Sequence, residues 1–105
     1  VSVDYPDYAR MVCRGVIEDE TSFGILICGS GTGMAIAANK VRGIRASLGY
    51  DEYSAMMARS DNDANVLTLR AREFDHSRYR HIVEAFLKTP FSNRQRHLKR
   101  ITKLE

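Results

Sequence analysis

Short apolar segments alternate with helical segments along this chain of 105 residues, and this alternation constrains the fold more than any other feature. Three apolar segments are predicted strands: residues 23–28 (FGILIC), 44–48 (IRASL) and 65–69 (NVLTL). Three helical segments follow them: residues 33–41, residues 51–60, and a segment that begins at Asp75 and stops before Pro90. Helical connections between consecutive strands are typical of a parallel sheet with helices on both faces.

The first strand is a continuous apolar run between Ser22 and Gly29, which predicts that it is buried on both faces. A further helix precedes it and begins near Pro6. An apolar stripe at helical spacing is predicted along this helix: Tyr8, Val12, Cys13, Val16 and Ile17. We therefore interpret Cys13 as a small core residue.

One domain is expected over residues 1–105, with no internal repeat and no low-complexity linker. It ends in a basic helix at residues 93–105, where Leu98 and Ile101 are the expected apolar contacts. Three strands are few for a sheet covered on both sides, and the chain begins directly with a helix. We therefore expect that strands are missing from the N-terminal side of this chain.

The composition is that of an ordinary protein of the cytoplasm, with 44% hydrophobic and 28% charged residues. No apolar run is long enough to span a bilayer, and two cysteines are too few for a disulfide framework. The net charge is +3, and residues 94–103 carry five of the 16 basic residues and no acidic residue. Such a tail suits a solvated helix face, a ligand that bears phosphate, or a nucleic acid.

The stretch CGSGTG, residues 28–33, joins the first strand to the next helix. Ligands of such sheets bind at the carboxyl ends of the strands, where loop amides and the helix N-terminus favour an anion. The spacing fits neither the dinucleotide fingerprint, because Met34 stands at its sixth position, nor the P-loop, because Asn39 precedes Lys40. A tight turn without a ligand is the simplest alternative.

Cys28 ends the strand, and this position favours a thiolate, which can act as a nucleophile or as a base. A nucleophilic cysteine usually works with a histidine, but none of the three histidines follows a predicted strand directly. A cysteine base instead needs donors that stabilise the oxygen of a carbanion. The amides of residues 29–33 could supply them, and Ser30 adds a hydroxyl.

Four segments resemble ribose-5-phosphate isomerase B, of the family that includes the galactose-6-phosphate isomerase subunits: DYPDYA (4–9), GILICGSGTGMAIAANK (24–40), GIRASL (43–48) and NDANVLTL (62–69). The resemblance covers almost the whole chain, in order. It implies a flavodoxin-like or Rossmann-like αβα sandwich in a homodimer. It also implies isomerisation of a sugar phosphate between aldose and ketose through an enediolate, without a metal or other cofactor and without nucleic acid or membrane partners.

The resemblance also assigns roles to single residues. Cys28 matches the base, and five residues match the loop that holds the enediolate oxygen: Gly29, Ser30, Gly31, Thr32 and Gly33. Tyr5 matches a tyrosine beside the sugar, and Asn62 matches an asparagine that binds the sugar hydroxyls. Arg72 matches an arginine at the dimer-related site, and Arg96 and Arg100 match two phosphate ligands.

Three positions depart from the family pattern. The family usually has a histidine that opens the sugar ring where this chain has Asp61. Arg70 stands where glycine is common, and RQRH replaces GGRH before the tail motif. The family begins with a strand, a helix and another strand, and an Asp-His pair after the first strand contacts the sugar and the phosphate; the resemblance implies that these segments have no counterpart in this chain.

The sequence therefore predicts an isomerase, most directly of ribose 5-phosphate. A six-carbon aldose phosphate is the alternative substrate, and a non-catalytic phosphate-binding homologue is the alternative function. A nucleic-acid-binding module is the weakest alternative, since the tail has no aromatic platform.

Overall fold

The computed structural model describes residues 3–105. The elements, in chain order, are α1 (Tyr5–Glu18), β1 (Gly24–Cys28), α2 (Thr32–Asn39), β2 (Ala46–Leu48), α3 (Glu52–Asn62), β3 (Val66–Arg70), the 3-10 helix η1 (His76–Arg78), α4 (Tyr79–Lys88) and α5 (Gln95–Leu104). The predicted strands and helices are all present, with ends shifted by a few residues.

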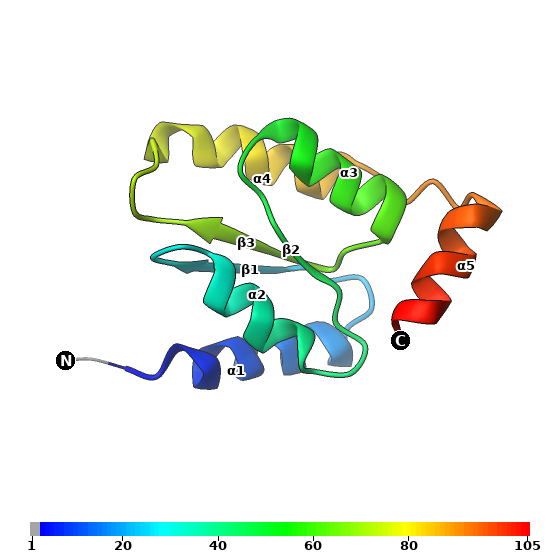
Figure 1. The fold of residues 1–105 in the computed structure, drawn as a ribbon, viewed down its shortest axis with the longest axis horizontal. Coiled ribbons are helices and arrows are strands. Elements are labelled where there is room, and N and C mark those ends of the chain that lie inside the picture. Colours follow the sequence, from blue (N-terminus) through cyan, green and yellow to red (C-terminus); the bar gives the residue numbers. More distant parts are fainter. Residues whose placement is uncertain (1–2) are drawn as a thin grey trace.

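The described strands form one parallel sheet in the order β1-β3-β2. The register pairs Cys28 with Arg70 and Leu48 with Thr68, so the carboxyl ends of the strands meet at one edge of the sheet. Helices α1 and α2 cover one face of the sheet, and α3 and α4 cover the other (Figure 1). This is the predicted αβα sandwich.

Two apolar cores lie on the two faces of β3. Val66 packs under α1 and α2 with Cys13, Val16 and Leu26. Leu67 and Leu69 point to the other face, toward buried side chains of α3 and α4: Ala55, Ala58, Ile82 and Phe86. The alternation of side chains along a strand explains why consecutive residues of β3 serve different cores.

The predicted stripe of α1 is wrong at its ends. Ala9, Cys13 and Val16 are buried and Val12 is half-buried, whereas Tyr8 and Ile17 are exposed. The buried set follows the same helical period but runs from Ala9 through Cys13 to Val16. Cys13 is a core residue, as predicted.

The prediction that the first strand is buried on both faces is also wrong. Leu26 is buried, but Ile27 is 47% exposed. The reason is the position of β1 at the edge of the sheet, where it has a neighbour on one side only among residues 3–105. β3 is the central strand, and its first four residues are buried.

Asp51 is the N-cap of α3 and forms a capping box with Ser54. The backbone N–H of Ser54 donates to Asp51 Oδ1 at 2.6 Å, and Ser54 Oγ accepts the N–H of Asp51 at 3.1 Å. The hydrogen bonds from Ser54 lower the pKa of Asp51 below its ordinary value, because they stabilise the carboxylate. This cap fixes the point at which the chain leaves β2 and starts back along the sheet.

The apolar contacts predicted for the last helix are partly wrong. Leu98 is 45% exposed and Ile101 is half-buried. The residue of α5 that is buried instead is His97. Helix α5 lies at the end of the sandwich beside α3, and His97 is its buried contact there (Figure 1).

Candidate active site

Cys28 is the last residue of β1 and lies half-buried at the carboxyl edge of the sheet. The backbone N–H of Gly31 donates a hydrogen bond to Cys28 Sγ at 3.2 Å. Gly31 is also the N-cap of α2, so the sulfur lies at the N-terminus of this helix. A donor and a helix N-terminus on the same sulfur atom both favour negative charge there.

Gly31 makes this geometry possible. Its φ is 78°, in the left-handed region that side chains disfavour. A β-carbon at this position would lie 2.5 Å from Leu48 Cδ1 and 3.2 Å from the carbonyl oxygen of Leu69. The loop therefore turns tightly over the ends of β2 and β3, and the N–H of Gly31 points at the cysteine sulfur.

Two predicted ligand residues pack against the other glycines of the loop. A β-carbon at Gly33 would lie 2.7 Å from Tyr5 Oη, so the tyrosine ring rests on the first turn of α2. A β-carbon at Gly29 would lie 2.9 Å from Arg72 Nε, and the N–H of Arg72 donates to the Gly29 carbonyl at 2.9 Å. Tyr5 and Arg72 thus lie on two sides of the loop.

The remaining predicted loop residues begin α2. Ser30 Oγ accepts the backbone N–H of Thr32 at 3.2 Å, which closes the turn. Ser30 and Thr32 are both exposed at the start of the helix. The structure therefore brings together Tyr5, the loop of residues 28–33 and Arg72 at the carboxyl edge of the sheet.

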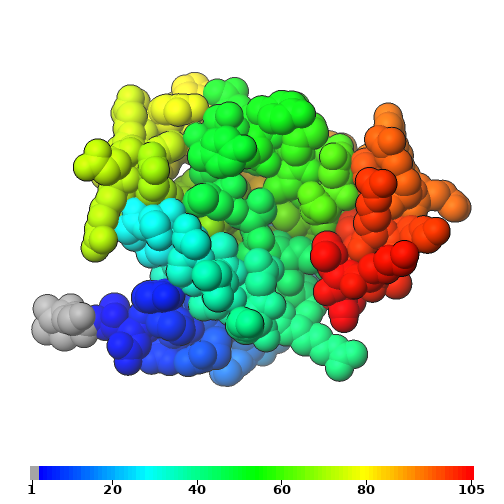
Figure 2. Space-filling model, viewed as in Figure 1, coloured from blue at the N-terminus to red at the C-terminus, as the bar shows by residue number. Residues whose placement is uncertain are grey.

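The other predicted residues lie at the opposite edge. Asp61 and Asn62 belong to the last turn of α3, which ends where the chain enters the amino end of β3. Arg96 and Arg100 are exposed on α5. Figure 2 shows α5, in orange and red, at the opposite end of the molecule from the cyan segment around the start of α2.

One chain therefore does not bring Asp61, Asn62, Arg96 and Arg100 to its own Cys28. Within residues 3–105, no acidic side chain forms an ion pair with Arg96 or Arg100. Their guanidinium groups are one helical turn apart on the same face of α5. They can bind a phosphate group held at a neighbouring molecule, with the bidentate hydrogen bonds typical of arginine.

Asp61 lies beside a histidine side chain that the sequence did not predict as its partner. Its Oδ1 lies 3.7 Å from Nε2 of His97, and Nδ1 of that ring lies 2.9 Å from Oγ of Ser92. The sequence indicates this contact only weakly, by a histidine inside the basic tail, 36 positions after Asp61. Two helices bring these residues together, and periodicity cannot predict how two helices pack.

The second cysteine is unsuited to chemistry with a substrate. Cys13 is completely buried, and burial raises the pKa of its thiol. The other histidines are exposed, and His76 makes a contact of 2.7 Å between its Nε2 and the Ala71 carbonyl. Cys28 is thus the thiol with access to a ligand.

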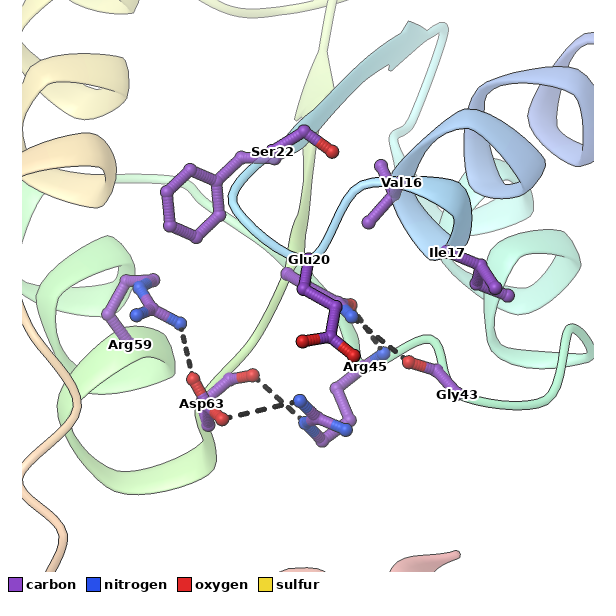
Figure 3. Close-up of a pocket in the computed structure, with 10 residues that line it drawn as sticks. Val16, Ile17, Glu20, Ser22, Gly43, Arg45, Arg59 and Asp63 are labelled. Carbon is purple, nitrogen blue, oxygen red and sulfur yellow. Dashed lines mark hydrogen bonds and ion pairs between the residues drawn. The ribbon is translucent and has the colours of Figure 1, made fainter.

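A cavity of about 430 Å³ lies at the amino end of the strands, and Figure 3 shows the residues that line it. Its two arginines, Arg45 and Arg59, are both paired with Asp63. Asp63 Oδ1 lies 2.8 Å from Arg59 Nη1, and Asp63 Oδ2 lies 3.4 Å from Arg45 Nη2. We therefore place the candidate site at the glycine loop and the basic helix rather than in this cavity.

Across the part of the chain that the structure describes, no group of three or more His, Cys, Asp or Glu side chains is placed to hold a metal ion. In the same residues, no helix has the length and apolar character needed to cross a membrane.

A parallel α/β sandwich with a cysteine and amide donors at a strand end, and a basic helix for phosphate, defines a class of protein that acts on small phosphorylated ligands. The model of the family described as Ribose/Galactose Isomerase matches residues 1–104. The chain belongs to this family and is a sugar-phosphate isomerase, an enzyme of the aldose–ketose type.

The names of similar proteins agree with this assignment. The chain is 47% identical over 103 residues to the putative sugar phosphate isomerase YwlF of Bacillus subtilis, covering 98% of this chain and 68% of the relative. It is 41% identical over 104 residues to the ribose-5-phosphate isomerase B of Escherichia coli, covering 97% and 70%. The structure of the Trypanosoma brucei type B ribose 5-phosphate isomerase superposes with a TM-score of 0.95 at 53% identity, covering 99% and 70%.

These relatives also bear on the expected missing strands. The chain spans about 70% of the length of the Escherichia coli protein and of the Trypanosoma brucei structure, while nearly all of its own residues are matched. The expectation that this chain lacks a segment of the family agrees with that coverage.

Proposed function

We propose that this protein interconverts ribose 5-phosphate and ribulose 5-phosphate, with Cys28 as the base. The hydrogen bond from the Gly31 N–H to Cys28 Sγ carries the proposal, because it places a thiol among amide donors at the edge where such sheets bind ligands. The names of the relatives support the substrate, since several are ribose-5-phosphate isomerases.

In the proposed reaction, the Cys28 thiolate removes the proton from C2 of the open-chain aldose. The electrons of that C–H bond form a C1–C2 double bond, and the carbonyl oxygen on C1 becomes an enediolate oxygen. The proton then returns to C1, while the hydroxyl hydrogen on O2 moves to O1, which leaves a ketone at C2. No atom or electron is gained or lost, so the step needs no redox cofactor.

The amides of the loop, residues 29–33, would hold the enediolate oxygen. Amide donors fixed before the reaction stabilise developing charge without reorganising, which is worth about 3–4 kcal/mol per donor in enzymes of this kind. This stabilisation is the role that a metal would otherwise fill, so the proposed mechanism is independent of metal. Tyr5 and Arg72 line the same loop and would contact the sugar.

The substrate's phosphate would bind Arg96 and Arg100. Since these arginines lie at the opposite end of the chain from Cys28, the proposal requires a second copy of the chain. In such a homodimer, one copy supplies Cys28 and the glycine loop, and the other supplies α5 with Asn62 and Asp61. The distribution of residues between the two edges of the sheet supports this arrangement.

Asp61 would open the sugar ring. Ring opening removes the hydrogen from the anomeric hydroxyl, breaks the bond between C1 and the ring oxygen, and puts a hydrogen on that oxygen. A carboxylate can accept the first proton on one oxygen and return it to the neighbouring ring oxygen, so that the protons balance. This chemistry does not need a histidine at position 61, although a histidine is the usual residue of the family there.

The substitution Cys28→Ala tests the proposal. We expect turnover of ribose 5-phosphate to fall by two to four orders of magnitude, the usual contribution of a general base, while the affinity for the sugar phosphate changes little. The matched control is Cys13→Ala, which removes the buried thiol and should leave the rate per folded molecule unchanged. Near-normal turnover of Cys28→Ala would refute the role of Cys28. A parent protein that isomerises a six-carbon aldose phosphate faster than ribose 5-phosphate would instead refute the substrate.

A further inference from the structure

Asp61, His97 and Ser92 form a cluster of polar side chains away from the glycine loop. Asp61 lies in the last turn of α3, His97 near the start of α5, and Ser92 in the segment between α4 and α5. The cluster contains two titratable side chains in contact, Oδ1 of Asp61 and Nε2 of His97, 3.7 Å apart.

Burial gives the two side chains different positions in the cluster. The side chain of His97 is 8% exposed and that of Asp61 is 42% exposed. The imidazole therefore lies behind the carboxylate, where a substrate cannot reach it directly. Asp61 presents an oxygen to the outside, on the side of the molecule that carries Arg96 and Arg100.

The hydrogen bonds around Ser92 are compatible with a proton on Nε2 of His97. Ser92 Oγ accepts the backbone N–H of Arg94 at 3.3 Å, so its own hydroxyl hydrogen is free to be donated. The nearest acceptor is Nδ1 of His97, at 2.9 Å. A neutral imidazole that accepts at Nδ1 carries its hydrogen on Nε2, which is the nitrogen that faces Asp61.

We propose that His97 is a positioning residue for Asp61: its Nε2 faces one carboxylate oxygen at 3.7 Å, which orients the carboxylate and leaves the other oxygen free to move a proton between the two oxygens bonded to C1 of the sugar. The contact between Ser92 and Nδ1 is compatible with a hydrogen on Nε2. The inference rests on the proposed function, because it concerns the ring-opening step of the same isomerisation. The closing experiment separates the two.

A purely structural role is the alternative, since His97 is also the buried residue of α5. The two roles predict different losses. A loosened α5 would displace Arg96 and Arg100 and weaken phosphate binding along with the rate. A positioning role affects the rate of ring opening and leaves the affinity for the sugar phosphate in place.

The experiment uses the Cys28→Ala protein, in which isomerisation is removed and ring opening can be measured alone. Exchange between the α and β anomers of ribose 5-phosphate is followed by magnetisation-transfer NMR, and the affinity for the same compound by calorimetry. When Asp61→Asn is added to this protein, the rate of anomer exchange should fall at least about 100-fold if Asp61 acts as an acid–base group. Adding His97→Phe should slow exchange about tenfold, the scale of a misplaced reacting group, with affinity unchanged.

Two further variants complete the test. His97→Gln places an amide N–H near the position of Nε2, and it should retain most of the exchange rate and guard against a variant that does not fold. His81→Gln, at an exposed histidine of α4, is the matched control and should change nothing.

The inference is overturned if His97→Phe keeps the exchange rate of its background while Asp61→Asn loses it, or if affinity and rate fall together in both His97 variants. It is also overturned if neither Asp61→Asn nor His97→Phe slows exchange. In all of these cases the proposed function stands as long as the parent isomerises ribose 5-phosphate and needs Cys28. A parent without isomerase activity overturns both.

Discussion

Gly31 and Cys28 determine the chemistry of the glycine loop at the scale of single residues. A positive φ at Gly31 turns its N–H onto the cysteine sulfur, and the nearby side chain of Leu48 leaves no room for a β-carbon. The sequence predicted the loop, the strand end and the helix start from spacing alone. It could not predict that the amide of residue 31 donates to the sulfur, because that depends on one backbone angle.

The two thiols should react very differently with iodoacetamide. Cys13 is fully buried and its pKa is raised by burial, so its thiolate is scarce and shielded. Cys28 is half-buried, so its sulfur is open to the reagent. We expect one alkylated cysteine per folded chain and two after unfolding, measured by mass spectrometry.

The modified residue in the folded chain should be Cys28, and ribose 5-phosphate should slow the reaction. Cys28→Ala is the control and should leave the folded protein unmodified. Alkylation of Cys13 at a comparable rate would contradict the burial of α1 against the sheet.

At the scale of elements, the pattern of apolar residues predicted which segments are strands and helices but not how much of each is buried. Ile27 is exposed because β1 is at an edge, and the order β1-β3-β2 does not follow from the chain order. Leu98 is exposed and His97 buried because α5 turns the face that carries His97 toward the rest of the molecule. Both errors concern contacts between elements, which the local sequence does not encode.

Helix α5 carries the next prediction. Arg96→Ala or Arg100→Ala should each weaken the binding of ribose 5-phosphate by roughly 1–3 kcal/mol, the cost of a lost hydrogen bond to a charged group. Calorimetry with ribose 5-phosphate and with unphosphorylated ribose separates the phosphate contribution, because the variants should differ from the parent only with the phosphorylated sugar.

Lys103→Ala is the matched control, since Lys103 is an exposed basic residue in the last turn of the same helix. It should bind ribose 5-phosphate like the parent. Equal losses for all three variants would indicate a general effect of charge rather than a phosphate site. Unchanged sugar-phosphate binding by the arginine variants, together with weaker binding of RNA or DNA, would favour the nucleic-acid alternative.

At the scale of the whole molecule, the candidate site is divided between the two edges of the sheet. Tyr5, Cys28 and Arg72 lie at the carboxyl edge, and Asp61 and the arginines of α5 lie at the other end. The resemblance to the family supplied all of these residues, but no pattern in the sequence separates them into two groups. The direction of α3, which runs back along the sheet from β2 to β3, makes the separation unavoidable.

The division leads to a prediction about mixtures of two impaired variants, assayed at a ribose 5-phosphate concentration well below the Kd of the Arg100→Ala protein. In the proposed homodimer each site takes Cys28 from one copy and Arg100 from the other. If Cys28→Ala and Arg100→Ala proteins are mixed in equal amounts and their subunits exchange, half of the dimers are mixed. Each mixed dimer then has one site with both residues intact and one site with neither, so the mixture should regain about a quarter of the parental turnover of ribose 5-phosphate.

The control mixture combines Cys28→Ala with Cys28→Ser, and should regain nothing because every site lacks the thiol. Subunit exchange is verified by native mass spectrometry of chains with different isotope labels. If exchange is complete and the Cys28→Ala and Arg100→Ala mixture shows only the average of its components, each site is built within a single chain. In that case α5 would have to move toward the glycine loop to reach Cys28. Two contacts of α5 oppose such a movement: the one between His97 and Asp61, and the ion pair of Arg45 with Glu105 at 2.8 Å. Recovery of turnover is therefore the result that the fold favours.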